Sequence, residues 1–235
     1  MSLILIVTMV LVVSSTLAWV GFYVGIRALP GAAARQARWI IGSVVVAAAW
    51  LLGVLLLGGA GSLGPPRIPV ALGATLLVGY LLLLSPTFRR IIAAVPQHWL
   101  IGIQVFRILG VVWLVRYFAG GLPGLFALPA GIGDVATGLL APFVAYAWYR
   151  GKPFARSAAI AWNLFGTADL VNAVVLATLT GAGAGIVFPL LLIPAYGVPR
   201  SLLIHSYSLI GLLRRTSEQP QRAESLHYGI DAARA

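Results

Sequence analysis

Four ionisable residues lie inside hydrophobic runs of this chain, and charges in such positions restrict how it can fold. They are Arg107 in HWLIGIQVFRILGVVWLV, Asp134 in LPAGIGDVATGLLAPF, Asp169 in AIAWNLFGTADLVNAVVL and Arg200 in LLLIPAYGVPRSLLIHSYSLIGLL. A charge at the centre of a bilayer costs about 2.5–3.5 kcal/mol, so four unpaired charges would cost roughly 10–14 kcal/mol. Two arginines and two aspartates therefore predict a polytopic membrane protein with a shared, paired polar centre.

The composition supports a membrane protein. Of the 235 residues, 60% are hydrophobic and only 9% are charged, and the mean hydropathy is +0.99. Soluble domains carry about 25% charged residues. The absence of cysteine excludes disulfides and thiolate chemistry. The net charge of +11 could suggest a nucleic-acid partner, but most basic residues lie between hydrophobic runs, as topology signals do. We expect the lipid bilayer, and no nucleic acid, as the partner.

Seven segments have about the length of 20 apolar residues that a spanning helix needs. The N-terminal run has no basic residue before it, which predicts a retained first helix and not a cleaved signal. The sequence thus predicts an all-α integral membrane protein with one domain at residues 1–213 and a polar cytoplasmic tail at 214–235. The expected helices are residues 3–26, 39–60, 68–84, 99–115, 125–149, 157–179 and 186–213.

The distribution of arginine and lysine predicts the orientation. Alternate connections and the tail hold twelve of these residues, namely Arg27, Arg35, Arg38, Arg89, Arg90, Arg150, Lys152, Arg156, Arg214, Arg215, Arg222 and Arg234. The opposite connections hold only Arg67 and Arg116. The N-terminus is therefore expected outside and the C-terminus in the cytoplasm.

The fourth and fifth predicted helices supply half of the polar centre. Arg107 lies about 14 Å into a hydrocarbon core about 30 Å thick, and Gln104 precedes it by three residues on the same helix face. In the next helix, Asp134 follows a pair of glycines, and Thr137 comes about one turn later. Close helix packing or an opened backbone is expected near these glycines.

The sixth and seventh predicted helices supply the rest. Asn163, Asp169 and Asn172 form a winding polar stripe, and Arg200 follows a proline near mid-depth with His205 closer to the cytoplasm. Both arginines are expected to face the two aspartates, with the pairing open. The predicted polar centre comprises Gln104, Arg107, Asp134, Thr137, Asn163, Asp169, Asn172, Arg200 and His205.

Polar residues of the first three helices are expected to be structural. Hydroxyl groups can bond back to the carbonyl one turn earlier in their own helix. We expect this of Ser14, Ser15, Thr16, Ser43 and Thr75.

Intramembrane charges favour a functional site, and the leading interpretation is binding and translocation of a small polar solute or ion. A membrane enzyme acting on a lipid-like substrate and a structural or ligand-binding subunit of a membrane complex are the alternatives. No catalytic residue is assigned, and a homo-oligomer is left open. The small number of lysines relative to arginines suits a bacterial inner membrane.

No metal site and no cofactor are expected. Nearby arginines would oppose a metal ion at Asp134, Asp169 and His205. The only lysine, Lys152, lies in a connection, which excludes a retinal Schiff base. His98 and His205 differ in depth by roughly 12 Å, which argues against a haem held by two histidines.

Overall fold

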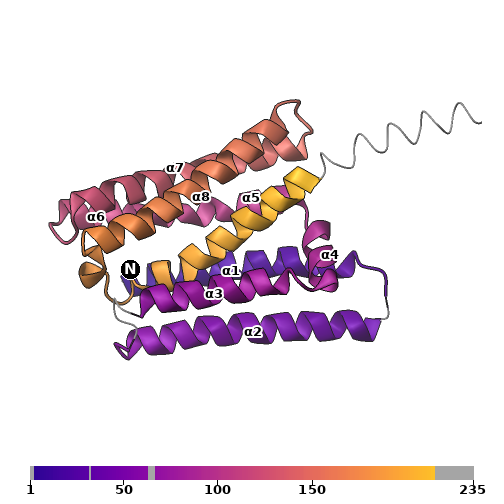
Figure 1. The fold of residues 1–235 in the computed structure, drawn as a ribbon, viewed down its shortest axis with the longest axis horizontal. Helices are drawn as coiled ribbons and strands as arrows, with labels where there is room; N and C mark the ends of the chain where they lie inside the picture. The colour runs from indigo at the N-terminus through magenta and orange to yellow at the C-terminus, as the bar shows by residue number, and fades with distance from the viewer. Residues whose placement is uncertain (1–2, 32, 63–66, 215–235) are drawn as a thin grey trace, which may run out of the picture.

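Helices are the only regular secondary structure in the part of the chain that the computed structural model describes, residues 3–31, 33–62 and 67–214. This confirms the predicted all-α class. The elements, drawn in Figure 1, are α1 (Leu3–Arg27), α2 (Ala33–Gly59), α3 (Ile68–Leu82), α4 (Pro86–Ala94), α5 (Gln97–Gly102), η1 (Ile103–Gly110), α6 (Val111–Phe118), α7 (Gly124–Tyr149), α8 (Ala155–Leu179), η2 (Ala182–Gly185) and η3 (Ile193–Gly197). Residues 198–214 form a last helix, here called the terminal helix. The predicted tail, beyond residue 214, lies outside the described residues.

Five helices among the described residues are long and apolar enough to cross a membrane. They span Ile4–Arg27, Arg35–Gly59, Gln97–Phe118, Gly124–Tyr149 and Ala155–Leu179. The pair α3 and α4, bent by 95°, would be a sixth span if it is counted as one. These helices support a multi-pass membrane protein, whereas the count of seven stays a prediction.

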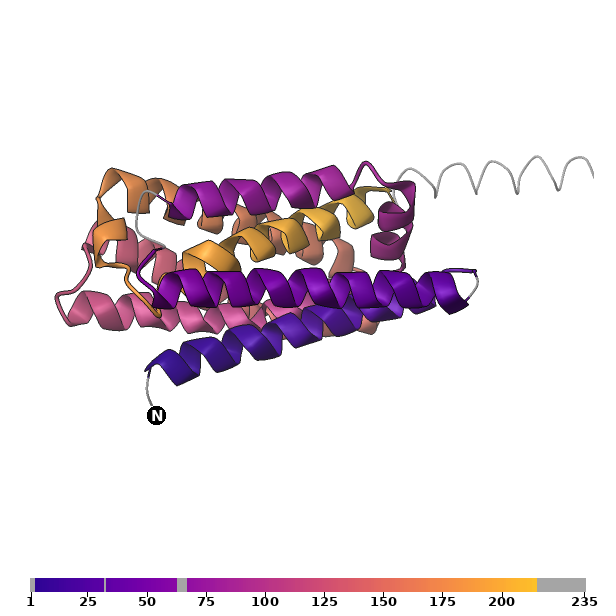
Figure 2. The same ribbon diagram turned by 90° about the horizontal axis from the view of Figure 1, so that it is seen from below.

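The terminal helix lies at the centre of the bundle. In Figure 1 it runs obliquely between α8 and α3, and in Figure 2 it is seen between α3 and α2. It is bonded to both neighbours, since the Tyr207 hydroxyl donates to the Gly79 carbonyl of α3 at 2.7 Å and Asn163 of α8 donates to the Ser208 hydroxyl at 2.8 Å. Helix α7 packs against α5, η1, α6 and α8, while α2 lies at the lower edge of the bundle in Figure 1. The terminal helix therefore joins the two sides of the molecule.

The fourth predicted span, 99–115, is one helical rod of three parts, α5, η1 and α6. Its middle part is a 3₁₀ helix with three residues per turn, so side chains three residues apart point in the same direction. Ile101, Gln104, Arg107, Gly110 and Trp113 are all buried. This 3₁₀ segment was not predicted, and it points Gln104 and Arg107 into the interior together.

The chain turns sharply after α3, close to the predicted end of the third span at residue 84. Ser85 and Pro86 begin α4, because the Ser85 hydroxyl accepts a bond from the Phe88 amide at 3.3 Å and proline suits the first helical turn. Helix α4 buries Phe88 and Ile91 and exposes Arg89 and Arg90. It is a short amphipathic helix nearly perpendicular to α3.

The seventh predicted segment, 186–213, is not helical over its whole length. Residues 187–190 contain no regular helix, and continuous helix begins at residue 192. A π-helical turn at Ile193–Gly197 contains Pro194, and Pro199 lies in the next turn. Proline lacks the amide hydrogen that a regular α-helical turn would use, which accounts for the irregular start.

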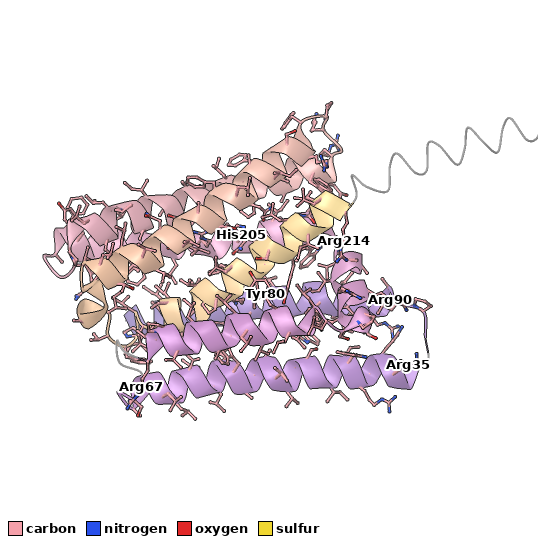
Figure 3. All side chains as sticks on the ribbon, viewed as in Figure 1. Arg35, Arg67, Tyr80, Arg90, His205 and Arg214 are labelled. Atoms are coloured by element: carbon pink, nitrogen blue, oxygen red, sulfur yellow. The ribbon has the colours of Figure 1, made fainter. Side chains whose placement is uncertain are left out.

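Basic residues gather at one end of the bundle. Figure 3 places Arg35, Arg90 and Arg214 at the same end and Arg67 at the opposite end. The N-terminus lies near the end that holds Arg67 (Figure 1). The end with Arg35, Arg90 and Arg214 is called the basic end below.

We expect Gly138→Ala to lower the thermal unfolding temperature of the purified protein. A Cβ on Gly138 would lie 2.6 Å from the Ile108 amide nitrogen, so α7 and η1 would have to separate. Overpacking of this kind costs about 1–3 kcal/mol. The measurement is tryptophan fluorescence during heating in detergent.

The control is Gly102→Ala, also in a helix, where an added Cβ would meet only the Ala145 side chain at 3.7 Å. This variant should be neutral or slightly stabilised, because alanine favours helix more than glycine does. Equal unfolding temperatures for wild type and both variants would contradict the close packing.

Candidate functional site

Arg107 is the centre of a buried polar cluster that links η1, α7, α8 and the terminal helix. Its side chain is 2% exposed. The Nε group donates to Asp134 Oδ1 at 2.7 Å, and an Nη2 hydrogen is directed to Asp169 Oδ2. Its Nη1 donates to the Gly166 carbonyl at 3.0 Å and lies 3.1 Å from His205 Nε2. One guanidinium thus holds two carboxylates, a carbonyl and an imidazole.

The contacts of Arg107 fix the state of His205. A guanidinium has five N–H donors and no acceptor, so the imidazole Nε2 must accept the bond from Nη1. An accepting nitrogen carries no hydrogen, and His205 is therefore neutral in this arrangement. Its remaining hydrogen lies on Nδ1, which faces Asn163 Oδ1 at 2.9 Å.

Asn163 continues the polar cluster toward the basic end. Its Nδ2 donates to the Ala159 carbonyl and to the Ser208 hydroxyl, both at 2.8 Å, which leaves Oδ1 to accept from His205. Gln97 Nε2 donates to the same Ser208 hydroxyl. The residues Arg107, His205, Asn163, Ser208 and Gln97 form one continuous hydrogen-bonded chain, here called the polar chain.

Two glycines create the space for this cluster. A Cβ on Gly166 would lie 2.6 Å from the His205 ring and 3.0 Å from Arg107 Nη1. A Cβ on Gly133 would collide with the Asp169 carboxylate. Arg107, Asp169 and His205 therefore occupy space that larger side chains at Gly133 of α7 and Gly166 of α8 would fill.

Gln104 and Thr137 lie beside the cluster and bond to the backbone around it. Gln104 and Ser201 bond reciprocally, since Gln104 Nε2 donates to the Ser201 carbonyl at 3.2 Å and the Ser201 hydroxyl donates to Gln104 Oε1 at 3.0 Å. The Thr137 hydroxyl donates to the Gly133 carbonyl, and the Thr137 carbonyl accepts from the Trp162 indole at 3.0 Å. Both predicted residues are buried and hold the surrounding helices in place.

Arg200 does not face the aspartates, and this part of the prediction is corrected. Its Nη1 donates to the Ser15 hydroxyl at 2.6 Å and its Nη2 to the Ser14 hydroxyl at 2.7 Å. The guanidinium carbon lies 4.4 Å from the centre of the Phe106 ring and 5.2 Å from that of Tyr196. Arg200 is thus bound by α1 hydroxyls and aromatic faces, away from the Arg107 cluster.

Asn172 is also outside the cluster. Positions 163 and 172 are nine residues apart, which rotates the second by about 180° around an α-helix. Asn163 is fully buried, Asp169 is partly buried, and Asn172 is exposed. The predicted stripe therefore winds out of the interior, and only its first part belongs to the site.

The sequence interpretation missed Ser14, Ser15, Ser208 and Gln97. The two α1 serines do bond to the Leu11 carbonyl as expected, but they also bind Arg200. Ser208 follows His205 by three residues, and this spacing could have identified it. No local signal assigns the α1 serines, because Arg200 is 185 residues away from Ser15.

The space around Arg107 is small. A cavity of about 20 Å³ lies between Arg107, Asp134, Leu11 and Ile193. Such a volume holds about one water molecule. Within the described ranges, no three His, Cys, Asp or Glu side chains are grouped so that they could hold a metal ion.

Residues 65–213 match a family model described as a domain of unknown function (DUF8737). The match covers more than half of the chain. This protein belongs to that family. The matched region contains the whole polar chain, Asp134, Asp169 and Arg200, whereas Ser14 and Ser15 lie before it. No curated protein and no solved structure gives a significant match to the sequence.

We expect Arg107→Lys to destabilise the protein by about 1–3 kcal/mol, because buried acceptors now bonded to Arg107 would be left without a donor. Lysine keeps the positive charge but has a single ammonium, which cannot bond two carboxylates, a carbonyl and an imidazole in the planar geometry of arginine. The measurement is the free energy of unfolding by denaturant titration in mixed micelles.

Arg90→Lys, on the exposed side of α4, is the matched control and should change the stability by less than about 0.5 kcal/mol. If Arg107→Lys were as stable as this control, the forked geometry would not be what stabilises the cluster.

Proposed function

We propose that this protein binds a proton at the Arg107 cluster and translocates it through the membrane. The observation that carries the proposal is the charge balance. Two carboxylates, Asp134 and Asp169, share one guanidinium, and His205 contributes no charge while its Nε2 accepts from Arg107. One negative charge is left over in the cluster, and a bound proton would neutralise it. Intramembrane carboxylates serve as proton relays in many pumps and transporters.

The size of the cavity favours a proton over a larger solute. The space beside Arg107 and Asp134 admits about one water molecule. A water at this position would be a carrier of protons, while an amino acid or sugar would not fit there in this conformation. We therefore narrow the predicted solute or ion to the proton.

The polar chain supports access from one side. It leads from Arg107 through His205, Asn163 and Ser208 to Gln97, which lines a pocket of about 330 Å³ at the basic end. Toward the opposite end, the interior is filled by a hydrophobic cluster that includes Trp113, Phe126, Ile186 and Leu190. A polar half and an apolar half are the expected features of a transport protein that is open toward one side only.

We further propose seven spans, with the helical stretch 192–214 as the last, the N-terminus outside and the basic end in the cytoplasm. This orientation follows the distribution of arginine and lysine and places the polar chain in the cytoplasmic half. Because arginine strongly outnumbers lysine, we propose the inner membrane of a bacterium.

The orientation can be tested with single cysteines, because the natural chain has none. Ala119→Cys lies at an exposed site after α6, and Lys152→Cys lies at an exposed site between α7 and α8. In intact spheroplasts, we expect a membrane-impermeant maleimide to label the first variant and not the second. After permeabilisation it should label both, and the reverse pattern would exclude the orientation.

Proton flux into vesicles tests the function. The purified protein is reconstituted with a pH-sensitive dye inside, and a potassium diffusion potential, negative inside, is imposed with valinomycin. We expect wild type to acidify the interior faster than protein-free vesicles. Asp134→Asn and Asp169→Asn should reduce the flux to the protein-free background, because an amide keeps the shape of the carboxyl group and carries no exchangeable charge.

Asn172→Ala is the matched control, since this exposed residue lies about one turn after Asp169 on the same helix. It should conduct as wild type does. A wild-type flux equal to the background, or aspartate variants that conduct normally, would refute proton translocation. Aspartate variants that unfold more easily and conduct normally would favour a purely structural role for the ion pairs.

A further inference from the structure

Arg200 is a cation inside the bundle with no carboxylate beside it among the described residues. Both salt bridges found there involve Arg107. The partners of Arg200 are the hydroxyls of Ser14 and Ser15 and the faces of two aromatic rings. Its Nε is buried and has no hydrogen-bond partner. These neutral partners leave the positive charge of Arg200 without a compensating anion.

An apolar pocket adjoins this arginine. Its volume is about 200 Å³, and it lies between α1, α4, α5 and the terminal helix. Arg200 lines the pocket together with apolar side chains such as Leu17, Phe22, Ile103 and Leu203. A mostly apolar pocket with one or a few polar groups is the usual form of a small-molecule site.

We propose that this pocket binds a small organic monocarboxylate with an apolar body, whose carboxylate pairs with Arg200. Besides the unbonded Nε, each Nη of Arg200 keeps one hydrogen beyond the one given to a serine, so the guanidinium has donors left for a carboxylate, which would supply the missing negative charge. An apolar cavity of about 150 Å³ can hold benzene. A volume of about 200 Å³ therefore fits a short-chain or single-ring acid. The apolar walls would contact its hydrocarbon part.

The same pocket borders a second, larger pocket. It shares Ile92, Val95, Leu100 and Tyr207 with the larger pocket at the basic end. That larger pocket is also lined by Arg89 and Arg214. Positive charge at a cleft entrance raises the local concentration of anions. The ligand would therefore enter at the basic end and move along the shared wall to Arg200.

This site is separate from the proton cluster, and the inference does not rest on proton translocation. Arg200 and Arg107 have no partner in common. Ligand binding with no proton flux, or proton flux with no ligand binding, would therefore support one proposal without the other.

Binding is tested by calorimetry on the full chain in nanodiscs of phosphatidylcholine, which avoids competition from detergent. The ligands are benzoate, hexanoate and palmitate, each compared with its neutral amide. We expect benzoate and hexanoate to bind and their amides to bind at least about tenfold more weakly, because a charged hydrogen bond is lost. A preference for palmitate would support carboxylate binding at Arg200 and overturn the restriction to small acids. The ligand would then be a membrane fatty acid.

Two variants test the two parts of the site. Arg200→Met should weaken carboxylate binding by about tenfold or more, since the charge is lost while much of the side-chain volume remains. Gly21→Leu should weaken it by filling the pocket, and its added Cβ has only ordinary contacts, with Val95 at 3.6 Å and Trp99 at 3.9 Å. Arg67→Met makes the same chemical change as Arg200→Met at an exposed position on the end opposite to the entrance and should leave binding unchanged.

The inference is overturned if none of the acids binds to wild type, or if each acid and its amide bind equally. It is also overturned if folded Arg200→Met or Gly21→Leu binds as wild type does. Should Arg200→Met fail to fold, Gly21→Leu still decides whether the pocket is the site.

Discussion

The forked contact of Arg107 with two carboxylates is the interaction on which the interior of this protein depends. Moving charges out of water costs several kcal/mol for each ion, and only good geometry with further hydrogen bonds compensates for it. The surrounding helices provide that geometry. The 3₁₀ segment directs Arg107 inward, Gly133 and Gly166 leave room for the charged groups, and His205 accepts a further N–H bond. Four helical segments are thereby fixed relative to one another.

The two interior arginines, Arg107 and Arg200, have different surroundings, and these surroundings suit different ligands. Arg107 is bonded to an excess of negative charge and has space for about one water beside it. Arg200 has only neutral partners and borders an apolar pocket ten times larger, about 200 Å³ against about 20 Å³. The first environment is suited to holding a proton and the second to holding an organic anion. Arg107 and Arg200 both lie within the matched family region, residues 65–213. The surroundings of Arg200 also include Ser14 and Ser15 of α1, which lie before that region.

Much of the polar centre was predictable, because an ionisable residue in a hydrophobic run usually faces the interior of the bundle and pairs with another polar group. Arg107, Asp134, Asp169 and His205 were expected to be in the interior, and the structure brings all four together. Asn172 lies outside the Arg107 cluster, because a spacing of nine residues from Asn163 turns its side chain to the opposite helix face. Arg200 was wrongly expected to face the aspartates; it binds α1 serines instead. The sequence of a helix does not show which neighbouring helix each of its side chains will face.

The sequence by itself determined the all-α class and five of the seven expected apolar spans. These follow from local properties, namely the length of an apolar run and the rise of a helix per residue. Only the tertiary structure decided that one arginine binds both aspartates while the other binds α1, and that α4 turns by 95° away from α3. Such pairings depend on the rotation and tilt of each helix against its neighbours. Rotation and tilt are set by side-chain packing across the bundle, through contacts between residues far apart in the chain.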